Sequence, residues 1–184
     1  MKQYFLEYKP FLLFLAKFFG TYLVLIFLYQ YYLSDFEKTK QVDGVTQIVA
    51  NHSGKLLSFF DSDTFLISNP NEASVKVYVH DQWVARIIEG CNALSVIILF
   101  VSFVIAFTGN LKKTLLFILM GSVIIYIFNI FRIALLCWAI YYFPEYEHIL
   151  HGVLFPLVIY GVVFALWIIW INKFSFYADK TKKQ

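Results

Sequence analysis

The chain has 184 residues, of which 60% are hydrophobic and 21% are aromatic, while only 15% are charged. A soluble domain of this size carries more charge and fewer apolar residues, so the composition excludes an ordinary soluble protein. We expect the lipid bilayer to surround the chain, and we expect no nucleic-acid partner.

Four stretches are apolar over about the 20 residues that are needed to cross a hydrocarbon core. They are residues 11–33, 92–108, 114–143 and 152–171. The second stretch is short and the third is long, so we expect the helices to tilt. The sequence therefore predicts an all-α integral membrane protein, a bundle of about four transmembrane helices that forms a single membrane domain over residues 1–184.

The first stretch is expected to remain in the protein as a membrane anchor. Its apolar core is longer than that of a typical signal peptide, and its Tyr-rich end at residues 29–32 offers no small-residue cleavage site. Aromatic clusters at residues 29–32 and 141–143 fall at the boundaries of predicted spans, as the aromatic belts of membrane interfaces do.

Basic residues indicate which loops stay in the cytoplasm. The N-terminal segment, the turn at residues 110–113 and the C-terminal tail together carry nine Lys and Arg residues against two acidic residues. Residues 34–90 and 144–151 carry five Lys and Arg residues against ten acidic residues. Short loops rich in Lys and Arg remain cytoplasmic. We therefore expect a multi-pass protein with both termini in the cytoplasm and residues 34–90 outside.

The outer insert of about residues 34–90 contains two segments that we interpret as strands. Residues 64–68 and 74–80 are rich in β-branched and aromatic residues, and the second segment alternates between apolar and polar positions. The turn-forming residues 69–72 join them. A lone hairpin is barely stable in water, so we expect a small β-hairpin that packs over the outer ends of the helices.

Three reactive side chains that are far apart in the chain are predicted to meet at one membrane face. Cys91 lies where the chain enters the second span, and His151 lies where it enters the fourth span, both from outside. Arg132 follows Lys113 by nineteen residues, which at about 1.5 Å per residue places it about 28 Å along a core of about 30 Å. All three side chains are therefore expected in the outer leaflet.

Arg132 is a functional-site hypothesis because an ionisable residue inside a span costs at least about 2.5 kcal/mol on insertion scales. The alternative is an arginine that extends its guanidinium outward to the lipid headgroups. Asn129 lies three residues earlier on the same helix face. The two residues thus form a polar patch on an otherwise apolar helix.

Cys91 has two interpretations. A cysteine is more often a small buried hydrophobic residue than a nucleophile. The position of Cys91 after Gly90, near a helix N-terminus and within reach of a guanidinium and an imidazole, is a setting that generates a reactive thiolate. Cys137 lies five residues after Arg132, about 140° around the helix, so we expect it to face elsewhere and to pack. A disulfide between the two cysteines is a further alternative.

A rival site consists of Glu147, His148 and His151. Imidazoles that are three residues apart on a helix can share a metal ion. The stretch 147–151 offers few further ligands, so we expect no metal ion and no cofactor.

The segments 89–94 (EGCNAL) and 129–133 (NIFRI), followed by His151 at the start of a span, resemble the Cys, Arg and His triad of the exosortase/archaeosortase family of membrane transpeptidases. The order and the spacing are the same. The resemblance covers residues 89–171 and is strongest to the compact F-type exosortases of Bacteroidota. The chain differs from the longer members, because it has about four spans and a sizeable outer insert.

The resemblance implies a thiol protease of the plasma (inner) membrane that acts as a transpeptidase. Such an enzyme cleaves a C-terminal sorting signal of exported proteins at the outer face and transfers them to an acceptor through a thioacyl intermediate. Its partners are membrane-anchored substrates with a C-terminal transmembrane helix and a basic tail. Cys91 would be the nucleophile, Arg132 would stabilise the intermediate and His151 would transfer protons, with Asn92 and Asn129 as supporting residues.

Two other functions remain open at this stage. The first is a non-catalytic assembly or scaffolding subunit, in which the insert binds another protein and the polar residues pack helices. The second is a small transporter or channel component in which Arg132 lines an anion path. The spans contain few other polar residues and no inverted repeat, which argues against the second alternative.

Overall fold

A computed structural model describes residues 2–107 and 109–175, and the side chains from Tyr8 onward. Thr108, the last residue of the second predicted span, lies outside the described residues. So do four tail residues that were counted in the charge argument, namely Asp179, Lys180, Lys182 and Lys183. In chain order the helices and strands are α1 (Lys2–Thr39), α2 (Gly44–Phe60), β1 (Thr64–Ser68), β2 (Val75–Val79), β3 (Gln82–Ile87), α3 (Leu94–Ala106), α4 (Leu111–Tyr142), α5 (Glu147–Ile149) and α6 (Phe155–Ile169). Short 3-10 turns cover Glu89–Cys91 and Pro144–Tyr146, and π-helical turns cover Leu150–Leu154 and Trp170–Phe174.

Three helices of the described residues are long and apolar enough to cross a membrane. They are Tyr8–Thr39, Leu111–Tyr142 and the continuous helical stretch Pro144–Phe174, in which α5 and α6 are joined through a π-helical turn. These helices coincide with the first, third and fourth predicted spans. The prediction of an all-α integral membrane protein with a small β-hairpin is confirmed in its class, because the described chain is mostly helical and its outer insert contains a small sheet.

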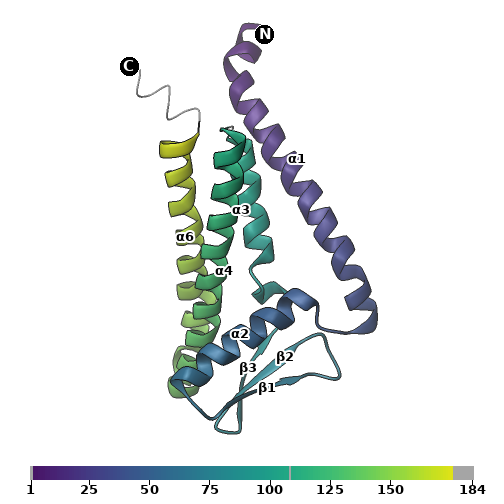
Figure 1. The fold of residues 1–184 in the computed structure, drawn as a ribbon, viewed down its shortest axis with the longest axis vertical. Coiled ribbons are helices and arrows are strands. Elements are labelled where there is room, and N and C mark those ends of the chain that lie inside the picture. The colour runs from purple at the N-terminus through teal and green to yellow at the C-terminus, as the bar shows by residue number, and fades with distance from the viewer. Residues whose placement is uncertain (1, 108, 176–184) are drawn as a thin grey trace.

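The second predicted span is shorter than expected. Helix α3 has 13 residues, which at about 1.5 Å per residue extends over about 20 Å and is too short to cross a core of about 30 Å by itself. Asn92 and Ala93, which were expected inside this span, lie before the helix begins. Helix α3 runs alongside α4 and α6, and α1 crosses the bundle obliquely and packs against α3 (Figure 1).

The bundle is packed around Phe100 of α3, which is completely buried. A Cβ atom added to Gly121 of α4 would lie only 2.3 Å from the ring of Phe100. The ring thus occupies the space that a larger side chain at position 121 would need. Ile125, Val163 and Trp170 complete this core between α3, α4 and α6.

Helix α2 was not predicted, and it crosses one end of the bundle between the sheet and α4 (Figure 1). Its first turn is capped by Asp43, whose carboxylate accepts hydrogen bonds from the N–H groups of Val45 and Thr46 at 3.0 Å. Four of the six residues on its buried face are small or polar, namely Thr46, Ala50, Ser53 and Gly54. This face therefore shows little of the apolar periodicity that reveals a helix in a sequence.

The predicted hairpin is part of a three-stranded antiparallel sheet with the order β1-β2-β3. The expected strands at 64–68 and 74–80 correspond to β1 and β2, while His80 lies in the next turn and β3 was missed. His80 and Asp81 both have positive φ values, 47° and 62°, as a two-residue type I′ turn requires. Such turns favour Asn-Gly or Asp-Gly, so the His-Asp pair gave no clear signal for a hairpin.

The apolar face of the sheet packs on α2 and α4. Val75, Val77 and Val79 of β2 are buried together with Ile87 of β3, with Val49, Ala50 and Leu57 of α2, and with Ile133, Ala134 and Cys137 of α4. This packing fixes the sheet at one end of the bundle, as we expected for a surface hairpin.

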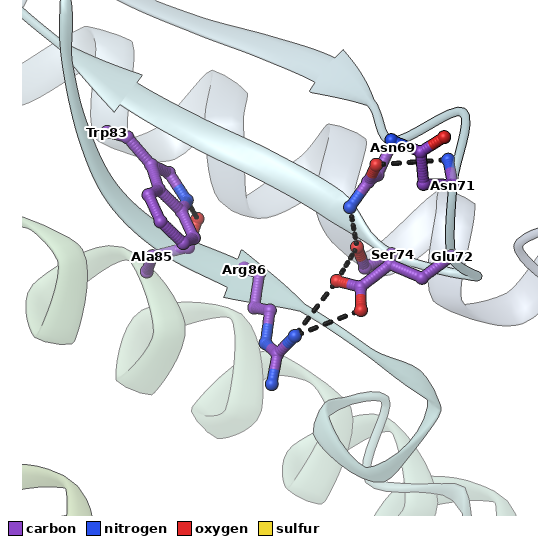
Figure 2. Close-up of polar contacts among 7 residues, drawn as sticks. All are labelled: Asn69, Asn71, Glu72, Ser74, Trp83, Ala85 and Arg86. Atoms are coloured by element: carbon purple, nitrogen blue, oxygen red, sulfur yellow. Dashed lines mark hydrogen bonds and ion pairs between the residues drawn. The ribbon is translucent and has the colours of Figure 1, made fainter.

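An ion pair ties the β1–β2 loop to β3 (Figure 2). Nη1 of Arg86 lies 2.9 and 3.0 Å from the two carboxylate oxygens of Glu72. The pKa of Glu72 is lowered, first by the hydrogen bond from Ser74 and then by Arg86. A carboxyl group whose pKa is depressed by folding stabilises the protein above its unfolded-state pKa, so this support is lost as the pH falls through the folded-state value.

The contact between Gly121 and Phe100 predicts that Gly121→Ala destabilises the bundle, although alanine favours helices over glycine. Overpacking against a fully buried ring costs about 1–3 kcal/mol, more than the roughly 1 kcal/mol gained in helix propensity. The matched control is Gly161→Ala in α6, where no atom of the described residues, apart from the surrounding turns of the same helix, lies within 4 Å of the new methyl group. Thermal unfolding in detergent should show a lower midpoint for Gly121→Ala alone, and equal midpoints would contradict this packing.

Candidate active site

Cys91 ends a 3-10 turn, Glu89–Cys91, that connects β3 to α3. The N–H of Cys91 donates to the carbonyl of Ile88 at 2.9 Å, and its side chain is half-buried. Two residues later Ala93 adopts a left-handed backbone conformation with a φ of 63°. A non-glycine residue in this region is strained, so the loop needs strong contacts to hold its shape.

The contacts that hold this loop come from two helices that precede it in the chain. Asn92 is buried, and its Nδ2 donates to the hydroxyl of Tyr29 on α1 at 3.0 Å and to Oγ1 of Thr46 on α2 at 3.1 Å. Tyr29 in turn donates to a carboxylate oxygen of Glu89 at 2.5 Å. Oδ1 of Asn92 accepts from the N–H of Leu94 at 2.8 Å, at the start of α3.

The fourth helix contacts Cys91 directly through Asn129. Nδ2 of Asn129 donates to the backbone carbonyl of Cys91 at 2.7 Å, and Asn129 is 1% exposed. The shared helix face of Asn129 and Arg132 thus contacts the loop that carries Cys91. Asn92 and Asn129 hold the backbone around Cys91. Neither of them lines the pocket that the side chain of Cys91 borders.

Cys91, Arg132 and His151 line one pocket of about 290 Å³. Its walls come from β3 with Ile88 and Cys91 after it, from one face of α4, and from the helical stretch that starts at Glu147. The remaining lining residues are Val84, Ala85, Arg86, Ile87, Ile88, Ile133, Leu136, Cys137, Ile140 and Glu147. The structure therefore brings together the three residues that the sequence singled out.

Arg132 lies between this pocket and a second one. The second pocket, of about 450 Å³, is almost entirely apolar and is lined by residues of α4, α6 and the end of α2; these are Phe60, Ile127, Phe128, Phe131, Leu135, Phe155 and Val158. Nε of Arg132 is buried, and among the described residues it has no hydrogen-bond partner. Within that part of the chain, the guanidinium also forms no ion pair.

His151 is exposed and lies in the π-helical turn Leu150–Leu154. Turns of this kind occur frequently at functional sites. Glu147 lies four residues earlier, on the same helix face, and lines the same pocket.

The prediction that Cys137 faces away from the site is wrong. Cys137 lines the same pocket as Cys91 and packs in the core between the sheet and α4. The pocket wall on α4 extends over two helical turns, from Arg132 to Ile140, so a residue 140° from Arg132 still borders it. The expectation that Cys137 packs is confirmed, because it is 2% exposed, and both cysteines are free.

Sequence reasoning missed the residues that support the site from a distance. Tyr29 and Thr46 precede Asn92 by more than forty residues, and no local pattern marks such pairs. Glu147 was considered only as a metal ligand. Within residues 2–107 and 109–175, no three His, Cys, Asp or Glu side chains gather closely enough to hold a metal ion.

The family model of the transmembrane exosortases (EpsH type) matches residues 11–171, which is most of the chain. The chain belongs to the transmembrane exosortase family. Comparison with curated proteins and with solved structures gave no significant match. Exosortases are cysteine transpeptidases of membranes, so membership supports a transpeptidase-like role for this chain in general terms.

The match to the exosortase family begins in α1 and ends in the last helical turn of the described chain. It thus includes α2, the sheet and the loop of Cys91 as well as the spans. The residues that position this loop, among them Tyr29 and Asn129, all lie inside the matched range.

The bond between Asn129 and Cys91 predicts that Asn129→Leu destabilises the exosortase fold. The substitution leaves the carbonyl of Cys91 without a partner, at a cost of about 1–3 kcal/mol for a buried polar group. Asn51→Leu is the matched control, because Asn51 is exposed and its one side-chain hydrogen bond within the described residues is accepted from Gln47 on the same helix. Thermal unfolding should show a clear decrease for Asn129→Leu alone, and an equal decrease in both variants would refute the anchoring role.

Proposed function

We propose that this exosortase is a membrane cysteine transpeptidase. It cleaves a C-terminal sorting signal of exported proteins and transfers them to an acceptor. The substrates are membrane-anchored proteins with a C-terminal transmembrane helix followed by a basic tail. The observation that carries the proposal is the single pocket lined by Cys91, Arg132 and His151.

The first half of the reaction forms a thioester. The thiolate of Cys91 attacks the carbonyl carbon of the scissile peptide bond, and a negative charge develops on the carbonyl oxygen. The guanidinium of Arg132 stabilises this oxyanion in a pocket that is partly shielded from water. His151 then donates a proton to the leaving amine, the C–N bond breaks, and the C-terminal helix departs with its tail.

The second half transfers the acyl group. His151, now neutral, accepts a proton from the acceptor nucleophile, which attacks the thioester carbonyl. The C–S bond breaks, and Cys91 leaves as a thiolate. An imidazole suits both steps because its charge changes near neutral pH.

We place the pocket at the outer face of the inner membrane, with both termini in the cytoplasm. The excess of Lys and Arg in the N-terminal segment, the α3–α4 turn and the tail supports this orientation. The start of α1 and the α3–α4 turn lie at one end of the bundle, and the sheet lies at the other end (Figure 1). The pocket borders the sheet, so this orientation places it outside.

Cys91→Ala should abolish processing of the substrates and leave membrane insertion intact. Mass spectrometry of the C-termini of membrane and secreted proteins, compared between wild-type and variant cells, measures this directly. We expect proteins with an intact C-terminal helix and basic tail to accumulate in the variant. In wild-type cells the same proteins should carry an acceptor at the new C-terminus, which distinguishes transfer from hydrolysis.

The matched control is Cys137→Ala, which removes a buried thiol from the same pocket and should leave processing at wild-type levels. Identical C-termini in wild-type and Cys91→Ala cells that express the protein would favour the alternative of a non-catalytic scaffolding subunit. Equal loss of processing in both cysteine variants would show that Cys91 acts through packing.

The proposed orientation predicts opposite accessibility for two exposed positions. In a chain with Cys91→Ala and Cys137→Ala, single cysteines are introduced as Asp81→Cys, in the β2–β3 turn, and Lys113→Cys, in the first turn of α4. A membrane-impermeant maleimide should label position 81 in intact cells and position 113 only after permeabilisation. The reverse pattern would place the pocket in the cytoplasm and exclude a role in processing exported proteins.

A further inference from the structure

Strand β3 is an edge strand that forms part of the wall of the Cys91 pocket. The sheet order is β1-β2-β3, so one long edge of β3 is unpaired. Residues 84–88 line the pocket, and the chain then enters the turn that ends at Cys91. In the described chain, no backbone hydrogen bond joins this edge to another element.

The pairing pattern identifies amide groups on the unpaired edge. The two-residue turn after β2 is closed by the pair Val79 and Gln82, which is hydrogen-bonded in a type I′ hairpin. Along two antiparallel strands, opposed residues alternate between hydrogen-bonded and non-hydrogen-bonded pairs. Tyr78 and Lys76 therefore occupy non-hydrogen-bonded positions relative to β3, and their backbone N–H and C=O groups point toward β1. Arg86 pairs with Lys76 across a bulge, and its N–H and C=O therefore face the unpaired edge.

Two side chains of β3 make their polar contacts inside the sheet region. The guanidinium of Arg86 is directed away to Glu72 in the β1–β2 loop, and the indole N–H of Trp83 donates to the carbonyl of Ala85 at 3.0 Å (Figure 2). The edge thus presents backbone donors and acceptors next to a thiol, and an extended polypeptide is the ligand whose own backbone matches them.

We propose that β3 binds the substrate polypeptide as an added strand and guides its scissile bond to Cys91. This inference rests on the proposed function, because it names how the same pocket recognises its substrate. A lipid chain would leave the edge amides unpaired, whereas a peptide strand pairs them. The edge is continuous with the pocket of Cys91, which favours the reacting peptide itself as the occupant.

The direction of the bound strand follows from the order in which the segments of the substrate follow one another along its chain. The membrane helix of the substrate comes after the scissile bond, so the residues before that bond are the ones available to the sheet. Strand β3 runs from Gln82 toward Cys91, and the bound segment must also end at Cys91. The substrate therefore lies parallel to β3, and it is recognised mainly through its backbone, with few demands on its side chains.

Peptide chloromethyl ketones test this without a known substrate. The thiolate of Cys91 displaces chloride from the methylene carbon and forms a thioether, and the peptide part precedes the reacting carbonyl as the substrate segment does. The probes are acetyl-alanyl, acetyl-tetra-alanyl and N-methylated acetyl-tetra-alanyl chloromethyl ketone, used with the full chain in lipid nanodiscs. Peptide mapping by mass spectrometry gives the labelling rates of Cys91 and of Cys137.

Strand addition predicts that the tetra-alanyl probe labels Cys91 about tenfold faster than the single-alanine probe, the gain expected from about two added hydrogen bonds. Methylation of the probe's backbone nitrogens removes donors and should abolish the gain. Arg86→Pro removes an N–H donor from the edge, so the tetra-alanyl probe should label its Cys91 no faster than the single-alanine probe does. Arg86→Ala lacks the same side chain but keeps the N–H, so it should still show the faster labelling. Ser68→Pro, at the opposite edge of the sheet, should retain it.

The outcomes separate the two proposals. If Cys91 is labelled faster than Cys137 but probe length and methylation have no effect, strand addition is refuted and the proposed nucleophile stands. The methylated probe gives this answer even if Arg86→Pro fails to fold. If Cys91 reacts no faster than Cys137 with every probe, the nucleophile is refuted, and the strand-binding role that rests on it is withdrawn.

Discussion

The loop of Cys91 is held by side-chain hydrogen bonds from three helices, and the arrangement of the site depends on them. Asn92 joins Tyr29 of α1 to Thr46 of α2, while Asn129 of α4 binds the carbonyl of Cys91. An unpaired polar group in an apolar bundle costs several kcal/mol. These donors and acceptors therefore stabilise the fold only when α1, α2 and α4 are all in place, so the assembly of the bundle also fixes the loop of Cys91.

The short α3 follows from the same constraint. The chain between β3 and Leu94 is irregular, and irregular backbone at membrane depth needs partners from the protein. Before this helix, Ile87 of β3 packs in the same core cluster as Ile133 and Cys137 of α4. The pocket is the space that remains between β3, α4 and the turn of His151.

Hydropathy predicted the three long spans because each exceeds the thickness of the bilayer and little else in the sequence competes with that signal. Counting residues along the spans also located Cys91, Arg132 and His151 near one another. Helix α2 was missed because its buried face contains Thr46, Ser53 and Gly54. The partners of Asn92 were missed because contacts across forty residues or more leave no local pattern in the sequence. Cys137 was misplaced because its angle from Arg132 around the helix was the only quantity considered, whereas the pocket is wide enough to contact both residues.

Arg132 lies between the site and a second, apolar pocket. Its Nε is buried without a partner in the described residues, and its side chain borders both the Cys91 pocket and an apolar pocket between α4 and α6. A cation with an unsatisfied donor destabilises the free protein, and this cost falls when negative charge develops within its reach. Under the proposed mechanism that charge is the oxyanion at Cys91. The arginine is then stabilised most in the transition state, and this is the condition that its interaction must meet to accelerate the reaction.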